Sequence, residues 1–214
     1  MNIWPKSCRE PDLLKRRLYA LSALDIIICP EEWLRRYRFY PRWKGEVTLA
    51  SISNGAGDDL YIVFAPEGTL IKGFDHESVI SPYVNDDGEV WPGIYEGVPA
   101  SLLNCLDDES LCKEDVTFCL WREQGDRVWK CGVSEPQGLN DGSDFLLGMI
   151  YETPYDYVEW AQYYYDLEVL DIDVVRRVFD GFQISEEMIN KLNPTRNTKS
   201  AVEEINEIGT FPGK

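Results

Sequence analysis

The segment that decides the fold runs from Tyr61 to Tyr83 and reads YIVFAPEGTLIKGFDHESVISPY. It contains two short apolar runs, Tyr61 to Ala65 and Thr69 to Phe74, separated by a Pro-Glu-Gly turn. A connection this short joins antiparallel neighbours, because parallel strands need a crossover of a dozen residues or more. The segment therefore predicts a hairpin, followed by a bend in the polar residues around the chain's single histidine.

Two flanking segments extend this hairpin into a sheet. Residues 46–52 alternate with a period of two, and the turn sequence NGAGD at residues 54–58 joins them to the hairpin as a three-stranded meander. A second hairpin is predicted from Val116 to Trp121 and from Arg127 to Val133, around a glycine turn. Pairing Trp121 with Trp129 would place Cys119 opposite Cys131 on one face.

Both ends of the chain are predicted to be helical. Apolar residues at helical spacing follow Pro11, and Pro30 with two glutamates after it predicts a second helix, whose basic face is formed by Arg35, Arg36, Arg38 and Arg42. Capping residues and apolar periodicity predict further helices near residues 143–150, 154–164, 171–182 and 185–192. The polar tail at residues 195–214 is expected to be weakly ordered.

These patterns together predict an α+β fold. We expect an antiparallel sheet, a meander plus a hairpin, with N-terminal helices and a C-terminal helical segment packed against it. Residues 1–194 are expected to form a single domain. Within it, residues 1–45 form a basic helical part, residues 46–133 are mainly β, and residues 141–194 are helical. Whether residues 1–45 form a separate lobe is left open.

The net charge of −17 is unevenly distributed along the chain. Residues 1–45 hold ten Lys/Arg and five Asp/Glu, a net charge of +5, whereas residues 46–214 hold eleven and thirty-three, a net charge of −22. A negative field repels nucleic acid and attracts basic proteins, so we expect a basic protein partner and no nucleic acid. The oligomeric state is left open.

The sequence also limits location and cofactors. It has no apolar run long enough to span a membrane and no secretory leader, so we expect a cytoplasmic protein with no membrane association. The six cysteines lack C-x-x-C spacing and are expected to be free thiols. With a single histidine, no zinc site is predicted, and we expect no cofactor and no metal.

The candidate catalytic residues lie in the polar bend, at Asp75, His76, Glu77 and Ser78. In one interpretation His76 works with nearby carboxylates, such as Asp75, Glu77, Asp141 or Asp144, in a carboxylate- or metal-dependent hydrolase. In the other, these residues hydrogen-bond locally and hold the bend, which is the usual role of Asp and Ser in turns. The sequence contains no nucleophile elbow and no phosphate-binding loop.

The candidate binding residues are aromatic or acidic. Tyr155, Glu159 and Tyr163 share one face of a predicted helix, beside the core stripe of the same helix. Exposed aromatic residues in this arrangement bind sugars or protein partners, although a half-buried tyrosine with a solvated hydroxyl is also common. Trp91 and Tyr95 are further binding candidates.

Four runs resemble an uncharacterised family of bacterial cytoplasmic proteins. They are GFDHESVISPY at residues 73–83, VWPGIYEGVP at 90–99, DVTFCLWR at 115–122 and DGSDFLL at 141–147. The resemblance covers roughly residues 60–194. Proteins of this family are loosely similar to toxin-immunity proteins, the small acidic neutralisers found beside bacterial toxins. It implies no catalytic residue.

Two functions follow as hypotheses. The first is a non-enzymatic protein-binding module, an immunity-type inhibitor of a basic partner or toxin, which the negative charge and the lack of catalytic motifs favour. The alternative is a carboxylate- or metal-dependent hydrolase centred on Asp75, His76 and Glu77. The sequence favours the binding protein and leaves enzymatic activity open.

Overall fold

A computed structural model of the chain describes residues 10–84, 88–132 and 138–213. These residues fall into two compact units. The sheet unit contains residues 42–149, and the helical unit contains residues 10–41 together with residues 150–213. The helical unit is therefore built from the two ends of the chain, which are far apart in the sequence.

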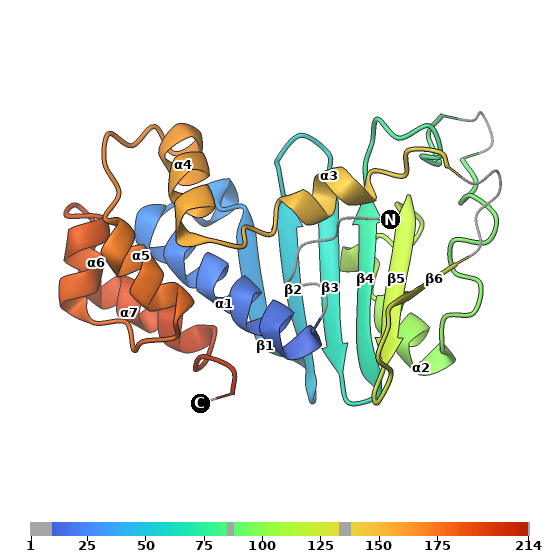
Figure 1. The fold of residues 1–214 in the computed structure, drawn as a ribbon, viewed down its shortest axis with the longest axis horizontal. Helices are drawn as coiled ribbons and strands as arrows, with labels where there is room; N and C mark the ends of the chain where they lie inside the picture. The colour runs from blue at the N-terminus through green and yellow to red at the C-terminus, as the bar shows by residue number, and fades with distance from the viewer. Residues whose placement is uncertain (1–9, 85–87, 133–137, 214) are drawn as a thin grey trace. The chain divides into compact units, whose positions relative to one another are not determined.

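The sheet has six strands in the order β1-β2-β3-β4-β5-β6 (Figure 1). The strands are β1 Tyr37–Lys44, β2 Val47–Ser53, β3 Asp59–Ala65, β4 Gly68–Phe74, β5 Phe118–Glu123 and β6 Lys130–Cys131. Neighbours from β2 to β6 pair antiparallel. In the hairpin formed by β3 and β4, Ala65 pairs with Gly68, which leaves a two-residue turn between the strands. The predicted α+β class with an antiparallel sheet is confirmed.

The register predicted for the second hairpin is wrong by one residue. Trp121 pairs with Lys130 instead of Trp129, and Cys131 lies opposite Leu120 instead of Cys119. A one-residue shift turns side chains to the opposite face, so the proposed pairing of Cys119 with Cys131 does not form. Ion pairs from Lys130 to Glu123 at the end of β5 and to Asp126 in the loop accompany the observed register. Val133 lies outside the described residues.

The predicted second N-terminal helix is also wrong. Residues Glu32–Leu34 form only a short 3₁₀ turn (η2), and the chain then enters β1. Tyr37 and Phe39 are buried while Arg38 and Tyr40 are more exposed, a period of two that belongs to a strand. The four arginines do not form one helical face: Arg35 and Arg36 lie in the segment before β1, and Arg38 and Arg42, four residues apart, share one face of the strand.

One face of the sheet carries the core of the sheet unit. The segment between β4 and β5 covers it and contains α2 Ala100–Leu103 and the 3₁₀ turns η3 Asn104–Asp107 and η4 Glu109–Leu111. β4 is buried at all seven positions, which makes it the central strand of this core. Lys72 is among them, only 1% exposed, and its Nζ donates to the Leu111 carbonyl at 2.7 Å. The last element of the unit is α3 Ser143–Gly148.

The helical unit is organised around α1 Pro11–Ile28, which is buried at every position from Leu18 to Ile28. α5 Ile172–Phe179, α6 Glu186–Leu192 and α7 Thr198–Glu207 all contact α1, and α4 Pro154–Tyr164 packs on α5 (Figure 1). A helix that is apolar on all sides is stable only when other elements bury it, because none of its sides is favoured in contact with water. None of the described helices is long and apolar enough to cross a membrane.

The segment at residues 195–214, expected to be weakly ordered, instead contains α7 with Ala201 and Ile205 buried. Arg196 donates to the carbonyl of Ile26 and forms an ion pair with Glu204 on α7. Arg35 forms a second ion pair with Glu204, at 2.6 Å. Two of these contacts, from Arg196 to Ile26 and from Arg35 to Glu204, join the tail to residues far away in the sequence, and for this reason the composition of the tail did not reveal them.

Candidate functional site

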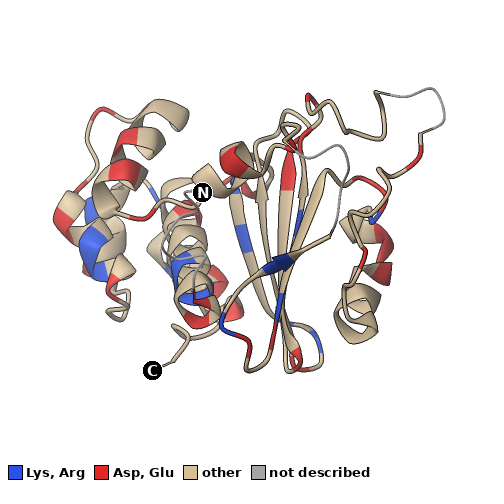
Figure 2. Ribbon diagram, turned by 45° about the vertical axis from the view of Figure 1, so that its right-hand side comes forward, with Lys and Arg blue, Asp and Glu red and all other residues tan. Residues whose placement is uncertain are grey.

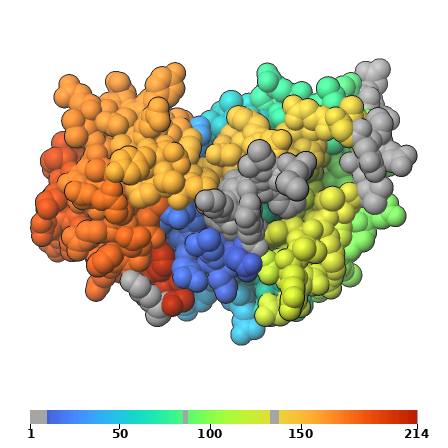
Figure 3. All heavy atoms as spheres, viewed as in Figure 1, coloured from blue at the N-terminus to red at the C-terminus, as the bar shows by residue number. Residues whose placement is uncertain are grey.

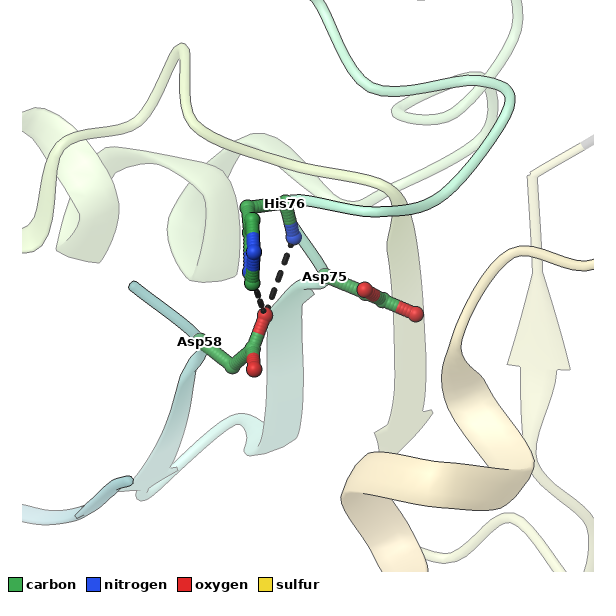
Figure 4. A group of neighbouring side chains, drawn as sticks. All are labelled: Asp58, Asp75 and His76. Carbon is green, nitrogen blue, oxygen red and sulfur yellow. Dashed lines mark hydrogen bonds and ion pairs between the residues drawn. The ribbon is translucent and has the colours of Figure 1, made fainter. Parts of the chain in front are cut away.

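The residues around His76 lie where two neighbouring strands end. Asp59 at the start of β3 pairs with Phe74 at the end of β4. Asp58 and Asp75 are each one residue beyond this pair, so the antiparallel register brings them to the same end of the sheet (Figure 4). His76 follows directly, in the bend that the sequence predicted.

Asp58 holds His76 through two hydrogen bonds to a single oxygen. Its Oδ1 accepts from the His76 backbone N–H at 3.0 Å and lies 2.7 Å from the ring Nδ1 (Figure 4). The Asn54 side chain donates to the other oxygen of Asp58. The Asp58 side chain is 5% exposed, whereas that of His76 is 45% exposed. The ring is therefore anchored at Nδ1 and partly open to solvent.

The two groups shift each other's pKa. The hydrogen bond to Asp58 raises the pKa of His76 above its ordinary value, because the imidazolium is held next to a carboxylate. Burial alone would raise the pKa of Asp58, but the hydrogen bonds from His76 and Asn54 outweigh it and leave that pKa lowered. The pair thus favours the charged form of both side chains.

The other predicted catalytic residues make separate structural contacts. Asp75 is buried and accepts from the Glu77 backbone N–H at 3.0 Å, whereas Glu77 itself is exposed. Ser78 is also buried, and its hydroxyl donates to the Asn140 carbonyl at 2.8 Å and accepts from the Ile80 N–H. A serine engaged in this way is poorly placed to act as a nucleophile.

The same bend holds the segment that leads into α3. The Thr117 hydroxyl donates to the Asp141 carbonyl at 2.7 Å and accepts from the Asp75 N–H at 3.2 Å. Gly142 lies against the Asp75 side chain so closely that a Cβ there would come within 2.3 Å of the Asp75 Cβ. Asp141 accepts from the backbone of α3, and Asp144 is exposed in the first turn of that helix.

Asp58, Asp75 and His76 form a group that could hold a metal ion. One ligand atom from each lies within 4.8 Å of the others. In this structure Asp58 and Asp75 instead accept hydrogen bonds from the chain's own N–H groups. Figure 4 shows Asp58 and His76 facing each other, with the Asp75 carboxylate turned away from that pair. An ion would have to replace these donors, so the geometry favours a structural corner.

Trp91 and Tyr95, two of the predicted binding residues, are partly buried against the core of the sheet unit. The Tyr95 hydroxyl donates to the Lys113 carbonyl at 2.7 Å, and burial raises its pKa. These contacts give Tyr95 a role in holding the loop between β4 and β5 in place.

The remaining binding candidates lie together on the outer face of α4. Tyr155 is 65% exposed, Tyr163 is 90% exposed, and Glu159 lies between them in the sequence and is also exposed. Tyr157 and Ala161, on the opposite face, are completely buried. The space-filling view shows α4, in orange, at the surface of the helical unit (Figure 3). The spacing of four residues thus predicted the exposed face correctly.

Sequence analysis missed two groups of residues that shape these sites. The first is Asp58, which anchors His76 and stands in the turn before β3, where an Asp has an obvious local role. The second is Arg36 and Arg176, whose guanidinium groups lie over aromatic rings of α4. Their sequence positions gave no signal, because both arginines lie outside α4: Arg36 comes before β1 and Arg176 is in α5.

Comparisons of the chain with protein-family models, with curated proteins and with solved structures found no match. The resemblance to bacterial cytoplasmic proteins therefore stays a prediction, and the function has to be argued from the site.

Proposed function

We propose that the chain is a non-enzymatic protein-binding module that captures a basic partner, as an immunity-type inhibitor would. The observation that carries the proposal is the outer face of α4. Tyr155 and Tyr163 expose most of their surface on either side of Glu159, although tyrosine rings are usually at least half buried. Tyrosine is enriched in protein interfaces, where its ring supplies contact area and its hydroxyl supplies a hydrogen bond.

The charge around this face supports a basic partner. Residues 151–170 contain five acidic residues and no Lys or Arg. α4 itself carries Asp156 and Glu159 as its only charged residues. Figure 2 shows the acidic residues of the ribbon in red and the basic residues in blue. An excess of negative charge steers an oppositely charged protein during encounter and accelerates association at low ionic strength.

A hydrolase centred on Asp75, His76 and Glu77 is the alternative function. It is supported by the Asp58–His76 pair, because a carboxylate on Nδ1 orients the ring as in many general bases. Against it, Ser78 and Asp75 already bond to backbone groups, and Glu77 is exposed and contributes only its backbone N–H to the bend. We therefore favour the binding function.

The proposal is tested by photo-crosslinking in cells that produce the protein. A photoreactive amino acid replaces Tyr163 in one variant and Tyr83, a 69% exposed tyrosine of the sheet unit, in the control. We expect one basic protein to be captured at low salt from position 163 and not from position 83. Its yield should fall when Glu159→Lys is added and when the salt concentration is raised. Equal capture from both positions, or no capture from position 163, would contradict the proposal.

A further inference from the structure

We propose that Glu159 and Tyr163 form a docking site for one arginine side chain of the partner. This inference rests on the proposed binding function and specifies what the outer face of α4 recognises. The helical unit stacks two of its own arginine side chains on aromatic rings of α4, and these contacts support the inference.

Three aromatic side chains of α4 already have a guanidinium group over them. The Arg176 guanidinium lies 5.8 Å from the ring centre of Tyr155, and its Nη2 donates to the Tyr155 hydroxyl at 3.3 Å. The Arg36 guanidinium lies 4.7 Å from the ring centres of both Trp160 and Tyr164. Such stacking is favourable because the planar cation faces the negative side of the ring.

Tyr163 differs from these three rings. It is 90% exposed, and within the described parts of the chain no ring stacking, cation or hydrogen bond involves its side chain. Its stacking surface therefore stays open to a cation from outside the chain.

The position of Glu159 supplies the second half of the site. Residues four apart on a helix are neighbours, with Cβ atoms roughly 5–6 Å apart, so Glu159 and Tyr163 lie side by side on one face. A guanidinium group placed there would stack on the ring and donate to the carboxylate at the same time. Arginine suits both contacts, because its planar fork matches a carboxylate and its face matches a ring.

The helical unit already contains one complete example of this arrangement. Arg176 forms an ion pair with Asp173 while it lies over Tyr155, so its guanidinium is held by a carboxylate and a tyrosine ring together. Glu159 and Tyr163 offer the same two groups, a carboxylate and a tyrosine ring, but no arginine of the described residues lies over the Tyr163 ring. A lysine ammonium is a compact point charge and would gain less from the ring.

The test compares two peptides of equal length and charge, acetyl-(Gly-Ser-Arg)4-amide and acetyl-(Gly-Ser-Lys)4-amide, in NMR titrations of the full chain. We expect the arginine peptide to shift the amide signals of residues 159–163 and to bind roughly threefold to fivefold more tightly than the lysine peptide. This ratio should fall to about one in Tyr163→Ala and persist in Tyr163→Phe, because the ring and not the hydroxyl carries the selectivity. The control Tyr83→Ala should retain the ratio.

The outcomes separate this inference from the proposed function. Equal affinities of the two peptides, or shifts spread over the acidic surface and absent from residues 159–163, would overturn the arginine site. A crosslinked partner at position 163 would in that case still support the binding function. Without such a partner, selective binding of the arginine peptide would support the site while the binding function fails.

Discussion

Asp25 offers the sharpest test of how the helical unit is held together. It lies in the apolar helix α1, is fully buried, and accepts three hydrogen bonds. Its Oδ2 accepts from the backbone N–H groups of Arg36 at 2.9 Å and Tyr37 at 3.0 Å, and its Oδ1 accepts from the Tyr157 hydroxyl at 3.1 Å. One carboxylate thus joins α1, the start of β1 and α4.

Substitution by alanine and by asparagine should have different effects. Asp25→Ala leaves two buried N–H groups and one hydroxyl without their acceptor, and each such group costs about 1–3 kcal/mol. We expect Asp25→Ala to lower the free energy of unfolding by at least about 3 kcal/mol at pH 7. Asp25→Asn keeps one oxygen for both N–H groups, and its amide can donate to Tyr157. Because it also removes a buried charge, it should stay within about 1 kcal/mol of the wild type.

The pH dependence gives a second measure of the same carboxylate. Burial raises the pKa of Asp25 to about 6 from 3.8, against the opposing effect of its hydrogen bonds. Between these two values the folded chain binds more protons than the unfolded chain, so the stabilising effect of protonation is lost as the pH rises. From pH 5.0 to 7.5 the wild type should therefore lose about 1.4 kcal/mol relative to Asp25→Asn.

The assay is urea unfolding followed by tryptophan fluorescence at both pH values. Glu203→Gln, which removes an exposed acid on α7, serves as the control and should leave the difference between pH values unchanged. Equal instability of Asp25→Asn and Asp25→Ala, or an equal response of the wild type and Asp25→Asn to pH, would contradict this role of the Asp25 carboxylate.

Three further predictions concern the sheet unit. Burial lowers the pKa of Lys72 to about 8 from 10.5, so the unfolded chain binds more protons than the folded chain between these values. From pH 7 to pH 9 the wild type should therefore gain about 1 kcal/mol of stability relative to Lys72→Met in urea titrations. An equal response of both proteins to pH would contradict this prediction. Asp58→Asn should lower the pKa of His76, measured by NMR of the imidazole, and an unchanged pKa would show that the pair does not form in solution. A Cβ at Gly73 would lie 2.1 Å from a ring atom of the paired phenylalanine on β5, so Gly73→Ala should cost about 1–3 kcal/mol in thermal or urea unfolding, whereas Gly148→Ala, with nothing within 4 Å, should cost less.

The sequence predicted those elements whose signals are local. The hairpin of β3 and β4 followed from two apolar runs around a short Pro-Glu-Gly turn, and this antiparallel pairing is observed. The caps of α4, α5 and α6 at Thr153, Asp171 and Ser185 accept hydrogen bonds from their first turns, as their residue types indicated. The exposed face of α4 followed from helical periodicity.

Elements whose conformation depends on distant partners were not predicted. Residues 37–44 have aromatic and basic residues compatible with a helix or a strand, and β1 forms because this segment joins the sheet. The register of β5 with β6 depends on contacts that no local pattern encodes, since either register preserves a hairpin. Order in α7 depends on Arg35 and Arg196 meeting Glu204.

The features of the candidate sites also fall into two groups, those that the sequence predicted and those that only tertiary contacts fix. The sequence by itself placed Asp75, His76, Glu77 and Ser78 in a bend and Tyr155, Glu159 and Tyr163 on one helical face, because turn formation and helical spacing act over a few residues. Only the tertiary structure decided that Asp58 anchors His76, that Ser78 is tied to Asn140, and that Arg36 and Arg176 stack on α4 while Tyr163 stays open. The physical reason is that hydrogen bonds and stacking join residues according to their positions in space, which folding fixes through the packing of whole elements.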